Sequence, residues 1–82
     1  PKPGAFTYFN GMRLKILRSS VEQSNEKKNP GSVVFCDKKL LIIQTGDGHI
    51  ELLTIQREGK KTMETPDFLN GVDINIGDTF GN

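Results

Sequence analysis

The sequence predicts an all-β domain with one short helix, in which five to six short strands form a small barrel-like sheet. Three observations support this fold class. Short apolar segments are separated by turns that contain glycine or proline along most of the 82 residues. Apolar and polar residues alternate in several of these segments, as expected for strands with one buried face. Helix start and stop residues occur together in only one short stretch, at positions 65–71.

Length and composition limit the chain to one domain, residues 1–82, with a thin hydrophobic core. Because Cys36 is the only cysteine, no internal disulfide is possible and a reducing compartment is expected. The longest aliphatic run, residues 40–43, is too short for a membrane span or a signal-peptide core. Since the chain opens with Pro1 and not with Met, we expect it to be a piece of a longer protein.

A β-hairpin is predicted at the start of the chain. The segment "AFTYF" is followed by Asn10 and Gly11 and then by "MRLKIL". Asn-Gly between alternating segments is the strongest short hairpin signal, because a type I′ turn needs positive φ at both central residues. Alternation then gives the second strand an apolar face and a basic face. The apolar positions are Met12, Leu14 and Ile16, and the opposite positions are Arg13, Lys15 and Leu17.

The middle of the chain reads as a polar loop followed by three strands. Residues 19–32 are polar and end in Pro-Gly, so a loop of about ten residues is expected there. Strands are predicted at residues 32–37 and 40–45, joined by a Lys38-Lys39 turn, and at residues 49–56 after a Gly-Asp-Gly turn. The continuous apolar run at residues 40–43 suggests a strand covered on both faces.

The strand at residues 49–56 changes phase halfway along. Ile50 and Leu52 share one parity, whereas Leu53 and Ile55 share the other. Such a change is what a β-bulge or a sharp bend produces, and it favours a small coiled or closed sheet over a flat one.

The helix is predicted to begin after Thr65 as N-cap, with Pro66 at the first helical position and Gly71 just beyond its end. Phe68 and Leu69 would then fold back onto the sheet. Alternating apolar residues between positions 72 and 80 would add a final strand.

The sequence offers no catalytic or metal-binding set. His49 is the only histidine, so a zinc cluster or a Cys/His couple has too few members, and a surface position is expected for His49. The segment "GKKT" at residues 59–62 resembles the end of a P-loop, but Thr54 stands at the first glycine position and Lys61 where Ser or Thr should follow the lysine. The segment is therefore either a basic contact or a solvated turn.

Charge is distributed unevenly along the chain. Residues 1–61 hold all eleven Lys and Arg against six acids, whereas residues 62–82 hold four acids and no base. This asymmetry points to an anionic partner of the basic part, or to chance segregation in a small domain. If the cations converge, they would contact phosphates without reading bases. The candidate nucleic-acid-binding residues are Arg13, Lys15, Lys38, Lys39, Arg57, Lys60 and Lys61.

Aromatic residues decide what kind of nucleic acid is expected. Tyr8 is the one candidate for an exposed, base-stacking ring, and its alternation partner Phe6 makes a core role more natural for both. We therefore expect recognition of a structured nucleic acid instead of a single strand.

Five segments occur in the order, and near the spacings, of the C-terminal domain of methionyl-tRNA formyltransferases, which the whole chain resembles. They are "PKPGAFTYFNGMRLKI", "PGSVV", "LLIIQTGDGHIELLTIQ", "GKKTM" and "FLNG". The resemblance implies an open Greek-key barrel similar to the oligonucleotide-binding fold. The sequence departs from that fold in showing only a turn, and no helix, between its third and fourth strands. It also has Lys2 where the family usually has an aromatic residue.

The resemblance implies a non-catalytic domain that supports initiator methionyl-tRNA. In the family, a preceding Rossmann-like domain transfers the formyl group from 10-formyltetrahydrofolate, so no cofactor or metal is expected on this domain. Lys60 and Lys61 fall on the Gly-Lys-Lys segment of the family, and Arg13 and Lys15 on its basic strand. The expected location is the bacterial cytoplasm or an organellar matrix, without membrane contact. The alternative is a structural or oligomerisation module of a sugar-type formyltransferase with no nucleic-acid role.

Overall fold

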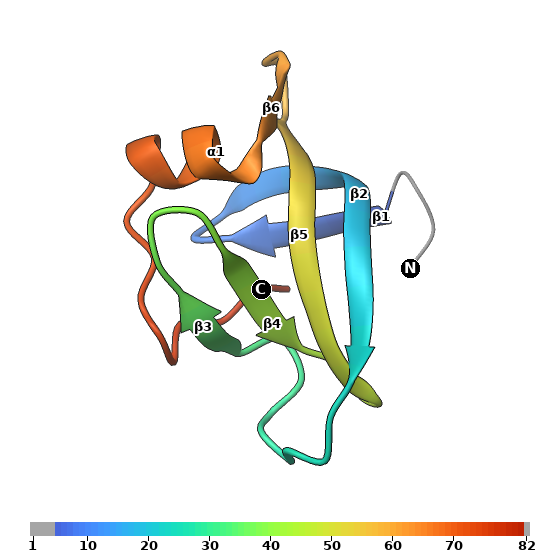
Figure 1. The fold of residues 1–82 in the computed structure, drawn as a ribbon. Coiled ribbons are helices and arrows are strands. Elements are labelled where there is room, and N and C mark those ends of the chain that lie inside the picture. The colour runs from blue at the N-terminus through green and yellow to red at the C-terminus, as the bar shows by residue number, and fades with distance from the viewer. Residues whose placement is uncertain (1–4, 82) are drawn as a thin grey trace.

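The computed structural model describes residues 5–81, which form one antiparallel sheet and a short helix (Figure 1). The all-β prediction with one short helix is confirmed. The elements are β1 (Ala5–Phe9), β2 (Met12–Gln23), β3 (Val33–Cys36), β4 (Leu41–Gln44), β5 (Gly48–Arg57), β6 (Thr62–Glu64) and α1 (Thr65–Gly71).

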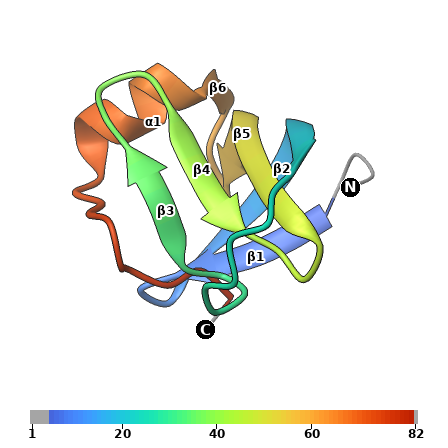
Figure 2. The ribbon, with the colours of Figure 1, turned by 60° about the horizontal axis from the view of Figure 1, so that its bottom comes forward.

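The strands pair in the order β1-β2-β5-β4-β3, and β6 adds to β5. All pairs are antiparallel, and the sheet coils so that β1 and β3, its two ends, approach each other (Figure 2). The C-terminal segment joins these ends. The Val33 N–H donates to the Asp78 carbonyl at 2.8 Å, and the Gly81 N–H donates to the Tyr8 carbonyl at 2.7 Å. The coiled sheet is consistent with the expected small OB-like barrel.

The first hairpin forms as predicted. Asn10 and Gly11 have φ values of 50° and 77°, as a type I′ turn requires. This two-residue turn pairs Phe9 with Met12, so the register of the whole hairpin is fixed. Leu14 and Ile16 are buried, which confirms the apolar face of β2.

The loop of about ten residues expected within residues 19–32 has the predicted length, but it begins later, at residue 24, because β2 continues to Gln23. Residues 19–23 pair with residues 48–52 of β5, and Val21 lies opposite Ile50. These ladder hydrogen bonds are made by the backbone, so an exposed polar segment can extend a strand that an apolar pattern does not reveal.

The predicted bend in β5 is confirmed. Between Ile16 and Ser19 the β2–β5 register shifts twice, which leaves Leu17 as an extra residue on β2 and Leu53 as an extra residue on β5. As a result Leu52 and Ile55 are both buried, although their spacing of three would place them on opposite faces of a regular strand.

The core lies inside the coiled sheet and is closed at one end by Phe68 of α1. Strand β4 contributes Leu41 and Ile43, but Ile42 is only half-buried and Leu40 is exposed. The prediction that this apolar run is covered on both faces is therefore wrong. Only the inner face of this apolar run is buried in the core, and no other element of the described chain packs on its outer face. The buried hydrophobic residues are Phe9, Leu14, Ile16, Val33, Leu41, Ile43, Leu52, Ile55, Phe68, Ile74 and Phe80.

Helix α1 begins one residue earlier and ends one residue later than predicted. Its N-cap is Glu64, which makes no side-chain capping bond, and Thr65 is the first helical residue. The Thr65 hydroxyl is used elsewhere, since it donates a buried 2.6 Å hydrogen bond to the Leu52 carbonyl. Gly71 is the last helical residue, and Val72 is the C-cap. Phe68 packs into the core as predicted, and Leu69 is half-buried against it.

The predicted final strand between residues 72 and 80 is absent. Ile74 is buried but Ile76 is 63% exposed, and Gly77 turns the chain with a φ of 97°. Only an isolated bridge joins Thr79 to Ser32, after which Phe80 stacks on Phe9 with ring centroids 4.7 Å apart. Alternation in this segment therefore reflects a turn anchored by single apolar residues. Within residues 5–81, α1 is too short to cross a membrane.

Replacing Thr65 by Val should destabilise the fold by about 1–3 kcal/mol, because the Leu52 carbonyl would lose its buried donor. Chemical denaturation measures this cost, and Thr65→Ser, which keeps the hydroxyl, is the matched control. Equal midpoints for the Val and Ser variants would show that the hydrogen bond does not stabilise the α1–β5 contact.

Candidate nucleic-acid-binding surface

Arg13 and Lys15 project from the outer face of β2 toward one aromatic ring. The Arg13 guanidinium lies over the Phe6 ring, with its Cζ 4.0 Å from the ring centroid, and the Lys15 Nζ lies 5.9 Å from the same centroid. Both distances are within the range in which a cation is attracted by the ring face. The ring therefore holds two positive charges close together on the surface.

Phe6 and Tyr8 are both exposed, at 53% and 42%, so the expected core role of these rings is wrong. The hairpin register explains the difference. Phe6 lies opposite Lys15 and Tyr8 opposite Arg13, and directly opposed residues of an antiparallel pair share one face of the sheet. These four residues, Phe6, Tyr8, Arg13 and Lys15, are called the aromatic–basic face below.

A shallow depression of about 160 Å³ adjoins this face at the end of β5. The Glu58 N–H donates to the Arg13 carbonyl at 3.2 Å, which holds the end of β5 against β2. The depression is lined by Phe6, Arg13, Lys15, Gln56, Arg57, Glu58 and Gly59. Three of the predicted cations thus meet at one hollow, although they come from two strands.

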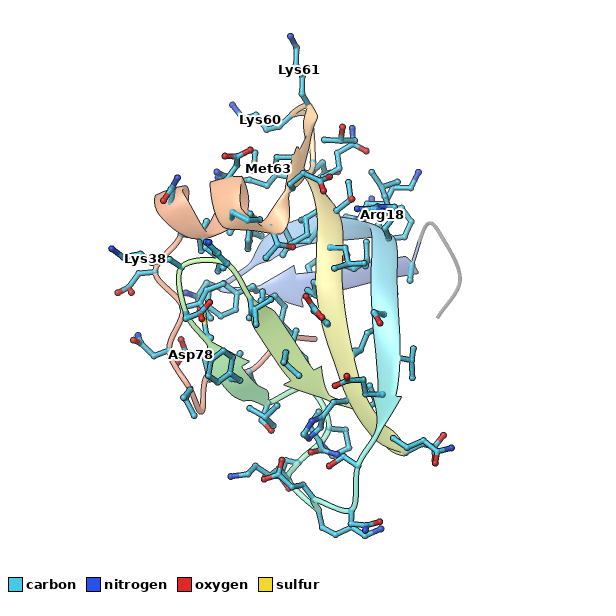
Figure 3. All side chains as sticks on the ribbon, viewed as in Figure 1. Arg18, Lys38, Lys60, Lys61, Met63 and Asp78 are labelled. Atoms are coloured by element: carbon cyan, nitrogen blue, oxygen red, sulfur yellow. The ribbon has the colours of Figure 1, made fainter. Side chains whose placement is uncertain are left out.

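Lys60 and Lys61 extend the same end of the molecule. Both are exposed in the β5–β6 turn, and Figure 3 shows them projecting from its tip. The turn is held by the Lys60 N–H, which donates to the Arg57 carbonyl at 2.9 Å, and by the Gln56 side-chain amide, which donates to the Lys60 carbonyl at 2.9 Å. The two ammonium groups are therefore placed on an ordered turn that follows Arg57 directly.

Lys38 and Lys39 lie elsewhere, in the β3–β4 turn. Figure 3 places Lys38 at the side of the molecule, apart from Lys60 and Lys61 at the top. Their turn is organised by Asp37, whose carboxylate accepts the N–H groups of Lys39 at 2.8 Å and Leu40 at 2.7 Å. These bonds, first that of Leu40, lower the pKa of Asp37.

The surroundings of the β3–β4 turn are acidic. Burial raises the pKa of the Cys36 thiol, and the negative charges of Asp37, Asp73 and Asp78 raise it further. Asp37 and Asp73 also line a depression of about 370 Å³ between this turn and the end of α1. An anion would therefore be attracted less here than beside β5, and the structure leaves Lys38 and Lys39 outside the main basic group.

Some cations are already paired with carboxylates. The Arg13 Nη1 lies 3.6 Å from the Glu58 Oε2, a loose contact between two exposed groups. Arg18, which the sequence analysis did not select, donates to Thr54 at 2.9 Å and to Glu64 at 3.2 Å. Among the residues that the structure describes, no carboxylate lies within 4.0 Å of the Lys15, Lys60 or Lys61 ammonium groups.

His49 is not the surface residue that was expected. Its side chain is only 16% exposed, and its Nε2 lies 3.0 Å from the Oε1 of Glu26 in the β2–β3 loop. Within residues 5–81, no group of three or more His, Cys, Asp or Glu side chains is arranged to hold a metal ion.

Comparison with known proteins identifies the family. A sequence model described as "Formyl transferase, C-terminal domain" matches residues 1–73. The chain belongs to this family. The resemblance noted from the five sequence segments is thereby confirmed.

Individual relatives support the same assignment. The chain is 47% identical over 83 residues to a methionyl-tRNA formyltransferase of Streptococcus suis and covers 26% of that protein. It is 40% identical over 81 residues to one from Syntrophomonas wolfei, again covering 26%, and 40% identical over 85 residues to one from Dictyoglomus turgidum, covering 27%. These matches span 99–100% of this chain. This chain thus spans about a quarter of the length of these relatives.

Asp37→Asn tests the turn that carries Lys38 and Lys39. The lowered pKa means that the carboxylate stabilises the fold above its unfolded pKa of about 3.9, and that this contribution is lost as the pH falls through the folded pKa. Asn keeps an acceptor oxygen but does not titrate. The thermal midpoint of the parent chain should therefore exceed that of the variant at neutral pH, and the difference should disappear as the pH falls through the lowered pKa of the folded state. A difference that persists at low pH would contradict this assignment.

Proposed function

We propose that the chain is the non-catalytic C-terminal domain of a methionyl-tRNA formyltransferase and offers a basic surface to initiator methionyl-tRNA. One observation carries the tRNA role. Arg13, Lys15 and Arg57 meet at the depression beside β5, and Lys60 and Lys61 project from the adjoining turn. Five cations on one end of a small barrel can neutralise several phosphates of a folded RNA.

The geometry suits phosphate contacts better than base-edge contacts along this basic group. Lys15, Lys60 and Lys61 are free of carboxylate partners within the described residues, so binding a phosphate would break no ion pair of theirs. A handful of phosphate contacts gives salt-sensitive affinity of about 10⁻⁴ to 10⁻⁶ M. Alone, the domain would therefore bind tRNA weakly, and it would orient tRNA that another domain modifies.

The formyl transfer itself belongs, in this proposal, to another part of the parent protein. Membership of a formyltransferase family implies a formyl donor in general, and we propose 10-formyltetrahydrofolate as that donor. Its pocket and the catalytic side chains would lie on a preceding Rossmann-like domain, the second partner of this chain. The proposed location is the bacterial cytoplasm, since the relatives are bacterial methionyl-tRNA formyltransferases.

A second candidate function is a purely structural module that packs against another domain or subunit. It is favoured by the exposed rings of Phe6 and Tyr8 and by the pairing of Arg13 with Glu58, since both features also occur at protein contacts. Binding of tRNA at low salt separates the two candidates, because the structural module would show none.

Replacing Lys60 and Lys61 together by Gln should make the negative slope of log K against log salt for tRNA shallower by about one to two units, because fewer phosphates are contacted. Titration of labelled tRNA at several sodium chloride concentrations measures the slope. The matched control is the double Gln variant of Lys27 and Lys28, an exposed lysine pair of the β2–β3 loop at the other end of the molecule (Figure 1). It should leave the slope nearly unchanged. An equal change of slope in both variants would show that the β5–β6 turn is not part of the binding surface.

A further inference from the structure

We propose that the aromatic–basic face stacks unpaired nucleobases of the bound RNA. This inference rests on the proposed tRNA-binding function and deepens it. The basic group beside β5 would hold phosphates, whereas Phe6 and Tyr8 would hold one or two bases of a single-stranded segment. The expectation from the sequence was the opposite, because it placed both rings in the core.

The arrangement of the four side chains carries the inference. Two rings on β1 face two cations on β2, with Tyr8 opposite Arg13 and Phe6 opposite Lys15. The guanidinium of Arg13 lies over the Phe6 ring at 4.0 Å. Bases stack on aromatic rings and on arginine planes alike, so a base can either displace Arg13 from the ring or continue the stack beyond the guanidinium.

The core of the domain does not account for the exposure of these rings. On the same strand Phe9 is 2% exposed and stacks on Phe80, so β1 already contributes its anchor to the core. Phe6 and Tyr8 point the other way and remain 53% and 42% exposed. Large exposed apolar groups beside each other are typical of a surface that binds something.

The cations indicate RNA rather than a protein as the occupant. Lysine is depleted in the buried centre of protein interfaces, whereas Lys15 lies directly opposite the exposed ring of Phe6. The Lys15 ammonium has no carboxylate within 4.0 Å in the described part of the chain. Aromatic rings next to cations that can take phosphates are the usual composition of surfaces that bind single strands.

A duplex would not need the two rings, because its bases already stack on one another. The occupant is therefore an unpaired segment, such as a loop or a free end of a folded RNA. Base stacking is tolerant of sequence, so little preference among the four bases is expected beyond stacking strength.

The chain provides its own reporter of stacking. Tyr8 is the only tyrosine and there is no tryptophan, so intrinsic fluorescence near 300 nm reports on Tyr8 alone. Titration with a short single-stranded oligoadenylate should quench this fluorescence. The control ligand is an abasic ribose-phosphate oligomer of equal length, which presents the same phosphates without bases. It should bind about five- to tenfold more weakly and leave the Tyr8 emission unquenched.

Variants then separate stacking from charge. Phe6→Leu should weaken oligoadenylate binding about five- to tenfold without changing the salt slope, while Phe6→Tyr should keep the parental affinity. Phe35, a 40% exposed ring on β3, provides the matched control, and Phe35→Leu should have no effect. Since Phe6 is exposed, its variants should fold, and circular dichroism checks this.

The outcomes distinguish the inference from the proposal on which it rests. Equal binding of the oligoadenylate and the abasic oligomer, or an unchanged affinity of Phe6→Leu, overturns stacking while salt-sensitive tRNA binding persists. Those results would leave the aromatic–basic face without a role in base stacking. Absence of tRNA binding at low salt overturns the tRNA role itself, and the stacking inference with it. The stacking inference is supported if oligoadenylate quenches Tyr8 and the abasic oligomer does not. Oligoadenylate binding should then be weaker in Phe6→Leu and unchanged in Phe35→Leu.

Discussion

The antiparallel pairing of β2 with β5 is the interaction on which the rest of the domain depends. Two register shifts, which leave Leu17 and Leu53 as extra residues, bend this pair in the middle. The bend turns both Leu52 and Ile55 into the core and lets the sheet coil until its end strands approach each other. Because the pair curves, its concave side is filled by apolar side chains and its convex side is left for charged ones. The same pairing sets Arg57 opposite Leu14 and Gln56 opposite Lys15, so the end of β5 lies beside the basic residues of β2.

The proposed binding surface depends on this β2–β5 pair and on one turn. The two-residue turn at Asn10 and Gly11 fixes which residues of β1 stand opposite Arg13 and Lys15. The bond from the Glu58 N–H to the Arg13 carbonyl then places the β5–β6 turn next to the hairpin. Charge from three chain segments is thereby concentrated on one end of the barrel. By contrast, the β3–β4 turn opens toward carboxylates near α1, so its two lysines stand apart.

Much of this fold was predictable from the sequence. The exposure of Phe6 and Tyr8 was predictable too, although a core position was expected for both. The hairpin turn and the phase change in β5 each have a local sequence cause, and both predictions are confirmed. The register of the hairpin also implies that Phe6 and Tyr8 share a face with Lys15 and Arg13, so their exposure could have been inferred. The segment between residues 72 and 80 could not have been assigned from alternation. Its course is set by contacts with β3 and by the stacking of Phe80 on Phe9, which are distant in sequence.

The central claim is that RNA meets one end of the barrel and not the whole surface. Backbone amide chemical-shift mapping during titration with initiator tRNA tests this most directly, because it monitors the amides of all strands and turns at once. The account predicts that the shifts concentrate on β1, on the first half of β2 and on residues 56–61, with little change in the β3–β4 turn. Shifts that spread evenly over the chain, or that centre on α1 and the β3–β4 turn, would contradict it.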